Sequence, residues 1–139
     1  MYLKKNLIEY LVWIIPIYRL RNRIRNNSIF LKDLGYRINY ANYKDKIKDA
    51  KFKNVYREFQ TKDGRRIDIL IVFDKFEIII ENKINASDQE NQLLDYYNDR
   101  YNEEKEIFLV YLTRWKYEAS EYSISKETKE ELKDNRKFL

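Results

Sequence analysis

The pattern of hydrophobic and polar positions divides the chain into two parts. Between positions 7 and 18 apolar residues recur at helical spacing, which predicts a helix over residues 3–25 that Pro16 bends or divides. A second short helix is predicted over residues 28–34, because Gly35 provides a stop signal. Together these segments form a predicted N-terminal helical region over residues 3–35.

Strand patterns replace the helical pattern in the second part. β-branched and aromatic residues fill several short segments almost continuously, which is typical of strands that are covered on both faces. The turn signals Asp63-Gly64 and Asp74-Lys75 separate the first three of these strands. The predicted strands comprise residues 55–60, 67–73, 76–84 and 107–113.

A helix is predicted between the third and fourth strands. Ser87 and Glu90 form a capping box at its start. Its apolar stripe consists of Leu93, Leu94, Tyr97 and Tyr101. A polar, exposed helix is predicted over about residues 124–137. The order of elements favours a single α/β domain over residues 1–139, with a mixed β-sheet flanked by helices and a core at about residues 53–113.

The turn at Asp74-Lys75 determines the predicted register of two long strands. With a two-residue loop, positions whose numbers add up to 149 face one another. One face of this pair of strands is then wholly apolar. On the other face Asp68 is opposite Glu81, and Arg66 is opposite Lys83. Facing carboxylates destabilise a strand pair and are unfavourable to bury, so a compensating charge is expected.

Two kinds of compensation are open for these carboxylates. A bound Mg²⁺ or Mn²⁺ would take oxygen ligands from Asp68 and Glu81, with the carbonyl of Asn82 as a further ligand. Alternatively, Arg66 and Lys83 would neutralise the acids in a salt-bridge cluster. The metal is favoured, because a plain salt-bridge cluster does not explain why so polar a group interrupts two strands filled with isoleucine.

Glu58 on the first predicted strand is a candidate auxiliary ligand. If the preceding hairpin loop has three residues, 62–64, with Gly64 left-handed, Glu58 faces Asp68. A two-residue loop would turn Glu58 away. Glu9 on the first predicted helix is the other candidate acid.

The composition limits the available chemistry. The 139 residues include no cysteine and no histidine, which excludes disulfides, Cys/His zinc sites, thiol nucleophiles and histidine bases. The net charge of +5 suits a nucleic-acid partner, although an AT-rich genome would produce a similar excess of lysine. No apolar segment is long enough to span a bilayer and no signal-peptide cleavage site is recognisable, so the expected protein is cytoplasmic and makes no membrane contact.

The residues around the carboxylates resemble the core of the PD-(D/E)xK nuclease superfamily. That family has an Asp in the second strand and a Glu-x-Lys in the third, which here read Arg66-Ile-Asp68-Ile-Leu-Ile and Ile-Ile-Ile-Glu81-Asn82-Lys83. A bacterial branch of uncharacterised members shares further residues with this chain, over about residues 55–120. These are Ile84-Asn-Ala86-Ser-Asp88-Gln89, Gln92-Leu93, Tyr96 and a fourth strand ending Leu-Val-Tyr-Leu-Thr.

The resemblance implies a restriction-endonuclease-like fold with an αβββαβ core. It also implies a nuclease that hydrolyses phosphodiester bonds with Mg²⁺ or Mn²⁺, on DNA more than on RNA. Asp68 and Glu81 would hold the metal, Lys83 would orient or polarise the attacking water, and Gln92 would contact phosphate or water in the site.

Three further residues are expected to contact the nucleic acid. Gln89 and Tyr96 lie on one helical stripe with Gln92, and Arg66 is placed to meet a backbone phosphate.

By analogy, the protein would act in a defence or mobile-element system. A homodimer is one way for so small a nuclease to cut both strands, although no segment is identifiable as an interface.

The chain departs from the family in two respects. Tyr10-Leu-Val-Trp13-Ile-Ile-Pro16 resembles the start of an N-terminal family motif, but the acidic residue before Pro16 and a following histidine are absent. The chain also ends soon after the core, which suggests a minimal or truncated member. The alternative hypotheses are therefore a catalytically inactive nucleic-acid-binding module and a structural protein with a salt-bridged sheet.

Overall fold

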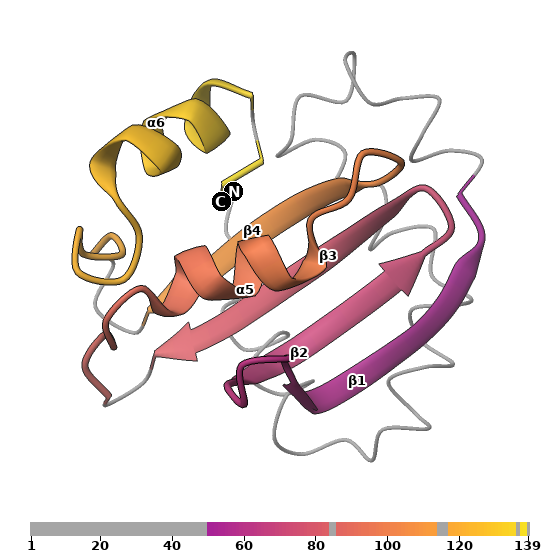
Figure 1. The fold of residues 1–139 in the computed structure, drawn as a ribbon, viewed down its shortest axis with the longest axis horizontal. Helices are drawn as coiled ribbons and strands as arrows, with labels where there is room; N and C mark the ends of the chain where they lie inside the picture. Colours follow the sequence, from indigo (N-terminus) through magenta and orange to yellow (C-terminus); the bar gives the residue numbers. More distant parts are fainter. Residues whose placement is uncertain (1–49, 84–85, 114–116, 136, 139) are drawn as a thin grey trace.

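The computed structural model describes residues 50–83, 86–113, 117–135 and 137–138. The helical region predicted over residues 3–35, including Glu9, lies outside these residues. The described part is a four-stranded mixed sheet with helices on one face and at one edge (Figure 1), as predicted for the α/β fold. No helix within the described ranges is long and apolar enough to cross a membrane.

The sheet has the strand order β1-β2-β3-β4. The first two pairings are antiparallel and the pairing of β3 with β4 is parallel. Two parallel neighbours require a crossover, and helix α5 (Gln92–Arg100) supplies it. The strands are β1 (Phe52–Gln60), β2 (Arg66–Phe73), β3 (Phe76–Lys83) and β4 (Glu106–Thr113).

The hairpin between β1 and β2 has a three-residue loop. The Thr61 N–H donates to the Arg65 carbonyl at 2.9 Å, and Gly64 adopts a φ of 87° in the left-handed region that favours glycine. This is the first of the two loop alternatives. The register therefore puts Glu58 opposite Asp68, between the pairs Arg57–Ile69 and Phe59–Ile67.

The hairpin between β2 and β3 has the predicted register. Ile69 pairs with Ile80 and Ile71 pairs with Ile78, so the numbers of facing residues add up to 149. The backbone pairing ends at Ile69 and Ile80. Asp68 and Glu81 therefore lie just beyond the last pair, rather than forming a pair as expected.

Helix α5 begins later than predicted. Its N-cap is Asn91, which makes no side-chain capping bond, so the predicted capping box of Ser87 and Glu90 is wrong. The reason is tertiary: the carbonyl of Ser123 accepts the N–H of Leu93 at 3.1 Å, so a distant segment satisfies the first turn. The predicted apolar stripe is also wrong at Tyr101, which is the C-cap and 57% exposed.

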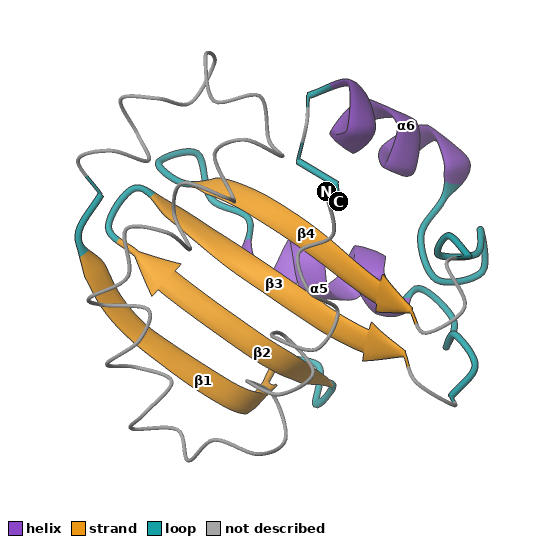
Figure 2. Ribbon diagram, turned by 180° about the vertical axis from the view of Figure 1, so that it is seen from behind, coloured by secondary structure: helices purple, strands orange, loops and turns teal. Residues whose placement is uncertain are grey.

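One hydrophobic core fills the space between the sheet and its helices. Figure 2 shows the sheet from the opposite side, with α5 crossing behind β3 and β4. Helix α6 (Lys126–Asp134) is shorter than the predicted 124–137 and contributes a single buried side chain, Leu132. The buried members of this core are Ile67, Leu70, Ile79, Leu93, Tyr96, Ile107, Leu109, Ala119, Ile124, Leu132 and Phe138.

Candidate active site

Asp68 lies near the start of β2, where the sheet loses its regular pairing. Its Oδ2 atom accepts a hydrogen bond from the backbone N–H of Asn82 at 2.9 Å. The carboxylate thus takes the place of a backbone acceptor for the neighbouring strand. Burial raises the pKa of Asp68 and outweighs the opposing effect of this hydrogen bond.

Glu81 is the buried acid of the site and is 3% exposed. Its Oε1 atom lies 2.9 Å from the Lys83 Nζ. Its Oε2 atom is also buried but has no hydrogen-bond partner among the described residues. Burial raises the pKa of Glu81 to about 7, and the negative charge of Asp68 adds to this effect.

Glu77, on the same side of strand β3 with Ile79 between it and Glu81, provides an internal comparison. It is equally buried at 1% exposure, but Arg100 binds both of its oxygens, at 2.7 and 3.0 Å. Lys105 adds a third cationic contact at 3.3 Å. Glu77 is therefore fully compensated as a structural ion pair, whereas Glu81 retains one uncompensated oxygen.

The predicted four-charge cluster does not form. Arg66 points to the surface, where its side chain is 69% exposed and lies 3.6 Å from Glu58. Lys83 is buried instead, so the expectation that these two cations lie side by side is wrong. The physical reason is that the strands stop pairing before Arg66 and Lys83, which frees the two side chains to diverge.

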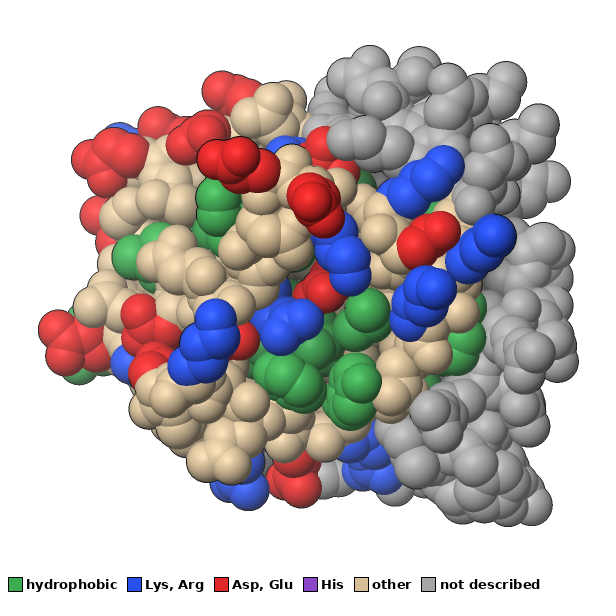
Figure 3. All heavy atoms as spheres, turned by 45° about the vertical axis from the view of Figure 1, so that its right-hand side comes forward, with side chains coloured by type: hydrophobic (Ala, Val, Ile, Leu, Met, Phe, Trp, Pro, Cys, Tyr) green, Lys and Arg blue, Asp and Glu red, His purple; other side chains and the backbone are tan. Residues whose placement is uncertain are grey.

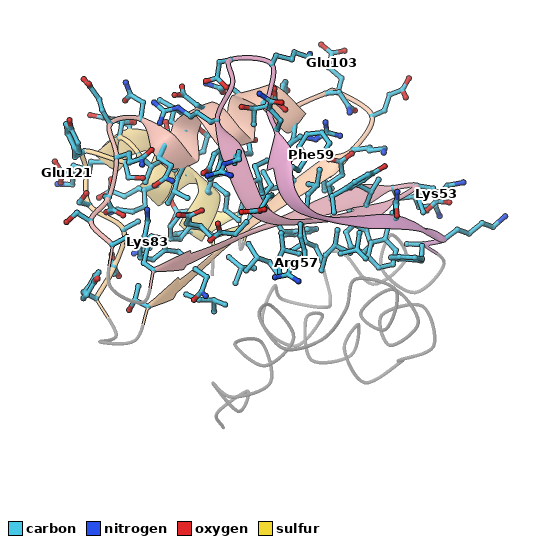
Figure 4. The ribbon with its side chains drawn as sticks, turned by 90° about the horizontal axis from the view of Figure 1, so that it is seen from below. Lys53, Arg57, Phe59, Lys83, Glu103 and Glu121 are labelled. Atoms are coloured by element: carbon cyan, nitrogen blue, oxygen red, sulfur yellow. The ribbon has the colours of Figure 1, made fainter. Side chains whose placement is uncertain are left out.

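Lys83 ends β3 with its ammonium group enclosed. Figure 4 shows it at the end of the sheet opposite to Lys53. Besides Glu81, its Nζ donates to the Gln92 Oε1 at 2.7 Å and to the Ser87 carbonyl at 3.3 Å. A lysine ammonium group has three protons, so each has an acceptor.

Gln92 links Lys83 to a buried tyrosine. Its Nε2 donates to the Tyr96 hydroxyl at 2.9 Å, and that hydroxyl donates to the Arg66 carbonyl. Burial raises the pKa of Tyr96, so the hydroxyl keeps the proton that it donates. Since this proton is committed to Arg66, the Gln92 amide is oriented with its oxygen toward Lys83.

Two residues expected to contact nucleic acid have different surroundings from those predicted. Tyr96 is 1% exposed, so it offers no surface to a large ligand. Gln89 precedes α5 and does not share a stripe with Gln92, because the helix begins later than predicted. Its side chain accepts from Arg65 Nη1 at 3.5 Å.

Arg65 and Arg66 follow each other in the sequence but differ in placement. Arg65 Nε forms an ion pair with Asp95 at 2.7 Å, which ties the first hairpin to α5. Arg66 remains at the surface beside the site.

On the face seen in Figure 3, basic and acidic side chains are intermixed around a small hydrophobic patch, so this face has no continuous basic surface within the described part of the chain.

Asp68 and Glu81 fit a hard divalent cation. The uncompensated oxygen of Glu81 and the raised pKa values of both acids indicate missing positive charge. No group of three or more metal-ligating side chains occurs in the described ranges. Mg²⁺ nevertheless needs few protein ligands, since it commonly binds one or two carboxylates together with water and substrate phosphates.

The two other predicted ligands have less direct support. Asn82 enters the site through its N–H, and its side-chain Nδ2 is buried without a hydrogen-bond partner among the described residues. Glu58 has a φ of 50° and an exposed side chain beside Arg66. Its negative charge adds to the raised pKa of Asp68, as its place opposite Asp68 in the register implies.

Asp88 forms hydrogen bonds with Tyr111 and Ser120 beside this site. None of these three residues has a role predicted from the sequence. The only sequence signal was the place of Asp88 within the stretch shared with the family. Tyr111 and Ser120 come from segments whose approach depends on the tertiary structure.

Comparison with known proteins agrees with the geometry. Residues 20–136 match the PD-(D/E)XK nuclease superfamily. No curated protein and no solved structure gives a significant match to the chain. The match extends over most of the sequence and includes Asp68, Glu81 and Lys83 as well as the whole described sheet. The chain therefore belongs to the PD-(D/E)XK nuclease superfamily.

Proposed function

We propose that this protein is a Mg²⁺-dependent nuclease that hydrolyses phosphodiester bonds in DNA. Asp68 and Glu81 are its metal ligands and Lys83 is its catalytic cation. Glu58 and the Asn82 carbonyl are candidates for completing the ligand set, and the exposed Arg66 is a candidate contact for a backbone phosphate.

The observation that carries the proposal is the uncompensated Oε2 atom of Glu81. A buried carboxylate oxygen without a partner is unfavourable by several kcal/mol when ionised. The same strand shows with Glu77 that this fold can compensate a buried acid fully by ion pairs. A cation shared by Glu81 and Asp68 explains why Glu81 is not compensated in that way.

The residues support a hydrolytic mechanism. When bound, a divalent cation would neutralise phosphate charge and lower the pKa of the attacking water. Lys83, held 2.9 Å from Glu81, places a positive charge where the attacked phosphate gains negative charge. Water attacks the phosphorus atom and gives up one proton to solvent, the bond from phosphorus to the leaving oxygen breaks, and that oxygen takes up a proton from solvent.

The first prediction is metal-dependent cleavage. Purified protein would be incubated with plasmid, linear duplex, single-stranded DNA and RNA, in Mg²⁺, Mn²⁺ or EDTA. We expect cutting of DNA in either metal and none in EDTA. Asp68→Ala and Lys83→Ala should each lower the rate at least about a hundredfold, since each removes charge stabilisation from the transition state.

Lys75→Ala is the matched control for Lys83→Ala, because Lys75 is an exposed lysine at the far end of the same hairpin. It should cut as well as the unchanged protein. Cleavage of RNA alone would contradict the substrate assignment. Binding without cleavage would indicate a nucleic-acid-binding module, and a calorimetric titration that detects no Mn²⁺ binding would exclude the metal site.

A further inference from the structure

Asp88 joins three segments of the chain beside the proposed site. It lies in the loop between β3 and α5. Its Oδ1 accepts from the Tyr111 hydroxyl of β4 at 2.7 Å, and its Oδ2 accepts from the Ser120 N–H at 2.8 Å. Tyr111 is also the register partner of Glu81 across the parallel strands. One carboxylate thus ties the loop both to the sheet and to the segment before α6.

The segment around Ser120 also holds the start of α5. The Tyr122 carbonyl accepts from the Asn91 N–H at 2.7 Å. The Ser123 carbonyl accepts from the Leu93 N–H at 3.1 Å, and Ser123 is fully buried. This turn therefore replaces a local helix cap, and it holds the residues on either side of Gln92, the glutamine that contacts Lys83.

Lys83 meets the anchored loop through the residue next to Asp88. The Ser87 carbonyl is the third acceptor of the Lys83 ammonium group, after Glu81 and Gln92. If the loop moved, this acceptor would be lost, and only Glu81 and Gln92 would hold the ammonium group in its position.

The ionisation state of Asp88 favours its two hydrogen bonds to Tyr111 and Ser120. Burial raises its pKa, but the hydrogen bonds from Ser120 and Tyr111 outweigh burial and lower the pKa overall. The carboxylate therefore stays an acceptor for both donors at neutral pH. Two hydrogen bonds to a charged group are each worth about 1.5–3 kcal/mol, enough to hold a loop.

We propose that Asp88 is a positioning residue whose tether to Tyr111 and Ser120 holds the Ser87 carbonyl against Lys83. The effect on catalysis rests on the proposed nuclease function. The effect on the placement of Lys83 does not, so the two can be tested separately.

Four variants separate the tether from other roles. Asp88→Ala removes both hydrogen bonds. Asp88→Asn keeps both without the charge, because the amide oxygen can accept from the Ser120 N–H while the amide nitrogen donates to the tyrosine hydroxyl. Tyr111→Phe removes one bond only. Glu90→Ala, at an exposed acid of the same loop, is the control.

Cleavage kinetics provide the first readout. Asp88→Ala should lower kcat about tenfold with KM unchanged, because a displaced catalytic group affects the chemical step more than binding. Tyr111→Phe should show a smaller loss of the same kind. Asp88→Asn and Glu90→Ala should remain close to the unchanged protein.

Acetylation by acetic anhydride, followed by mass spectrometry, provides a readout without activity. The labelling rate of Lys83 relative to the exposed Lys75 should rise several-fold in Asp88→Ala and stay low in Asp88→Asn. Unchanged Lys83 labelling in both Asp88→Ala and Tyr111→Phe would overturn the tether, as would an Asn variant as impaired as the Ala variant. If the unchanged protein cuts nothing, the nuclease proposal fails, while the labelling still decides the tether.

Discussion

At the scale of single residues, the two buried glutamates of β3 differ in the pairing of their second carboxylate oxygen. Arg100 binds both oxygens of Glu77, whereas Oε2 of Glu81 has no partner among the described residues. Glu81 is thus held in a place that favours its protonated form. Functional sites commonly contain ionisable groups whose charged form is destabilised in this way, because the group is left free to bind a ligand.

The penalty at Glu81 predicts a pH-dependent stability. Below about pH 4 the carboxyl is protonated in folded and unfolded protein, so no penalty exists. Between its ordinary pKa of 4.5 and the folded value of about 7, only the unfolded protein loses the proton, so stability falls as pH rises. Above about pH 7 the penalty is complete, on the order of 3 kcal/mol.

Glu81→Gln should therefore stabilise the metal-free protein at pH 8 and have little effect at pH 4. Urea unfolding at the two pH values, in EDTA, measures the difference. Glu103→Gln, at an exposed acid, serves as the control and should change neither value. Equal stability of Glu81→Gln and the unchanged protein at pH 8 would show that Glu81 carries no uncompensated charge.

The Tyr96 hydroxyl predicts a second effect at this scale. Tyr96→Phe removes the acceptor of the Gln92 amide and the donor to the Arg66 carbonyl. We expect a loss of about 1–3 kcal/mol of unfolding free energy, because buried polar groups lose their partners. Urea denaturation measures it. Tyr101→Phe, at a 57% exposed tyrosine, should leave the unfolding free energy unchanged. An equal loss of unfolding free energy in both variants would contradict the buried hydrogen bonds of Tyr96.

At the scale of elements, the start of α5 sets the geometry of the site. Gln92 opens the helix and reaches Lys83, so any shift of α5 along the sheet would separate the two side chains. The helix packs on the sheet through a narrow face in which Leu93 is fully buried and Leu94 only partly. The position of Gln92 therefore depends on the burial of its neighbour.

Leu93→Ala and Leu94→Ala form a matched pair that tests this packing. Leu93→Ala should lower the unfolding free energy by about 2–5 kcal/mol, because it leaves a cavity in the core. Leu94→Ala should lower the unfolding free energy by less than half as much, since part of the Leu94 side chain is already exposed to water. Equilibrium urea titrations of both variants provide the comparison, and similar losses would contradict the described helix orientation.

At the scale of the whole molecule, metal binding should be linked to stability. A ligand that binds only the folded protein stabilises it by about 2.7 kcal/mol at a concentration of 100 times its Kd. For a chain of 139 residues this corresponds to a rise in Tm of about 8 °C. We expect this rise with Mn²⁺ at pH 8 in thermal unfolding, with reversal by EDTA.

The same titration should give a smaller rise below pH 6, because protons compete with the cation for Glu81 and Asp68. Asp68→Ala should abolish the rise at both pH values. A rise that persists in Asp68→Ala would place the metal elsewhere in the molecule.

The amino-acid sequence by itself determined the strands of the sheet and the residues of the candidate site. The two-residue turn at Asp74-Lys75 sets the register of β2 and β3, so the proximity of Asp68 and Glu81 was predictable. The three-residue alternative for the first hairpin was also open to sequence reasoning, because Gly64 permits a left-handed residue.

Only the tertiary structure decided how the side chains around these acids are compensated. The start of α5, the burial of Tyr96, the surface position of Arg66 and the link from Asp88 to Ser120 all depend on groups distant in the sequence. Local patterns specify hydrogen bonds within one element, whereas a helix start capped by another segment, or a buried oxygen without a partner, exists only once the chain is packed.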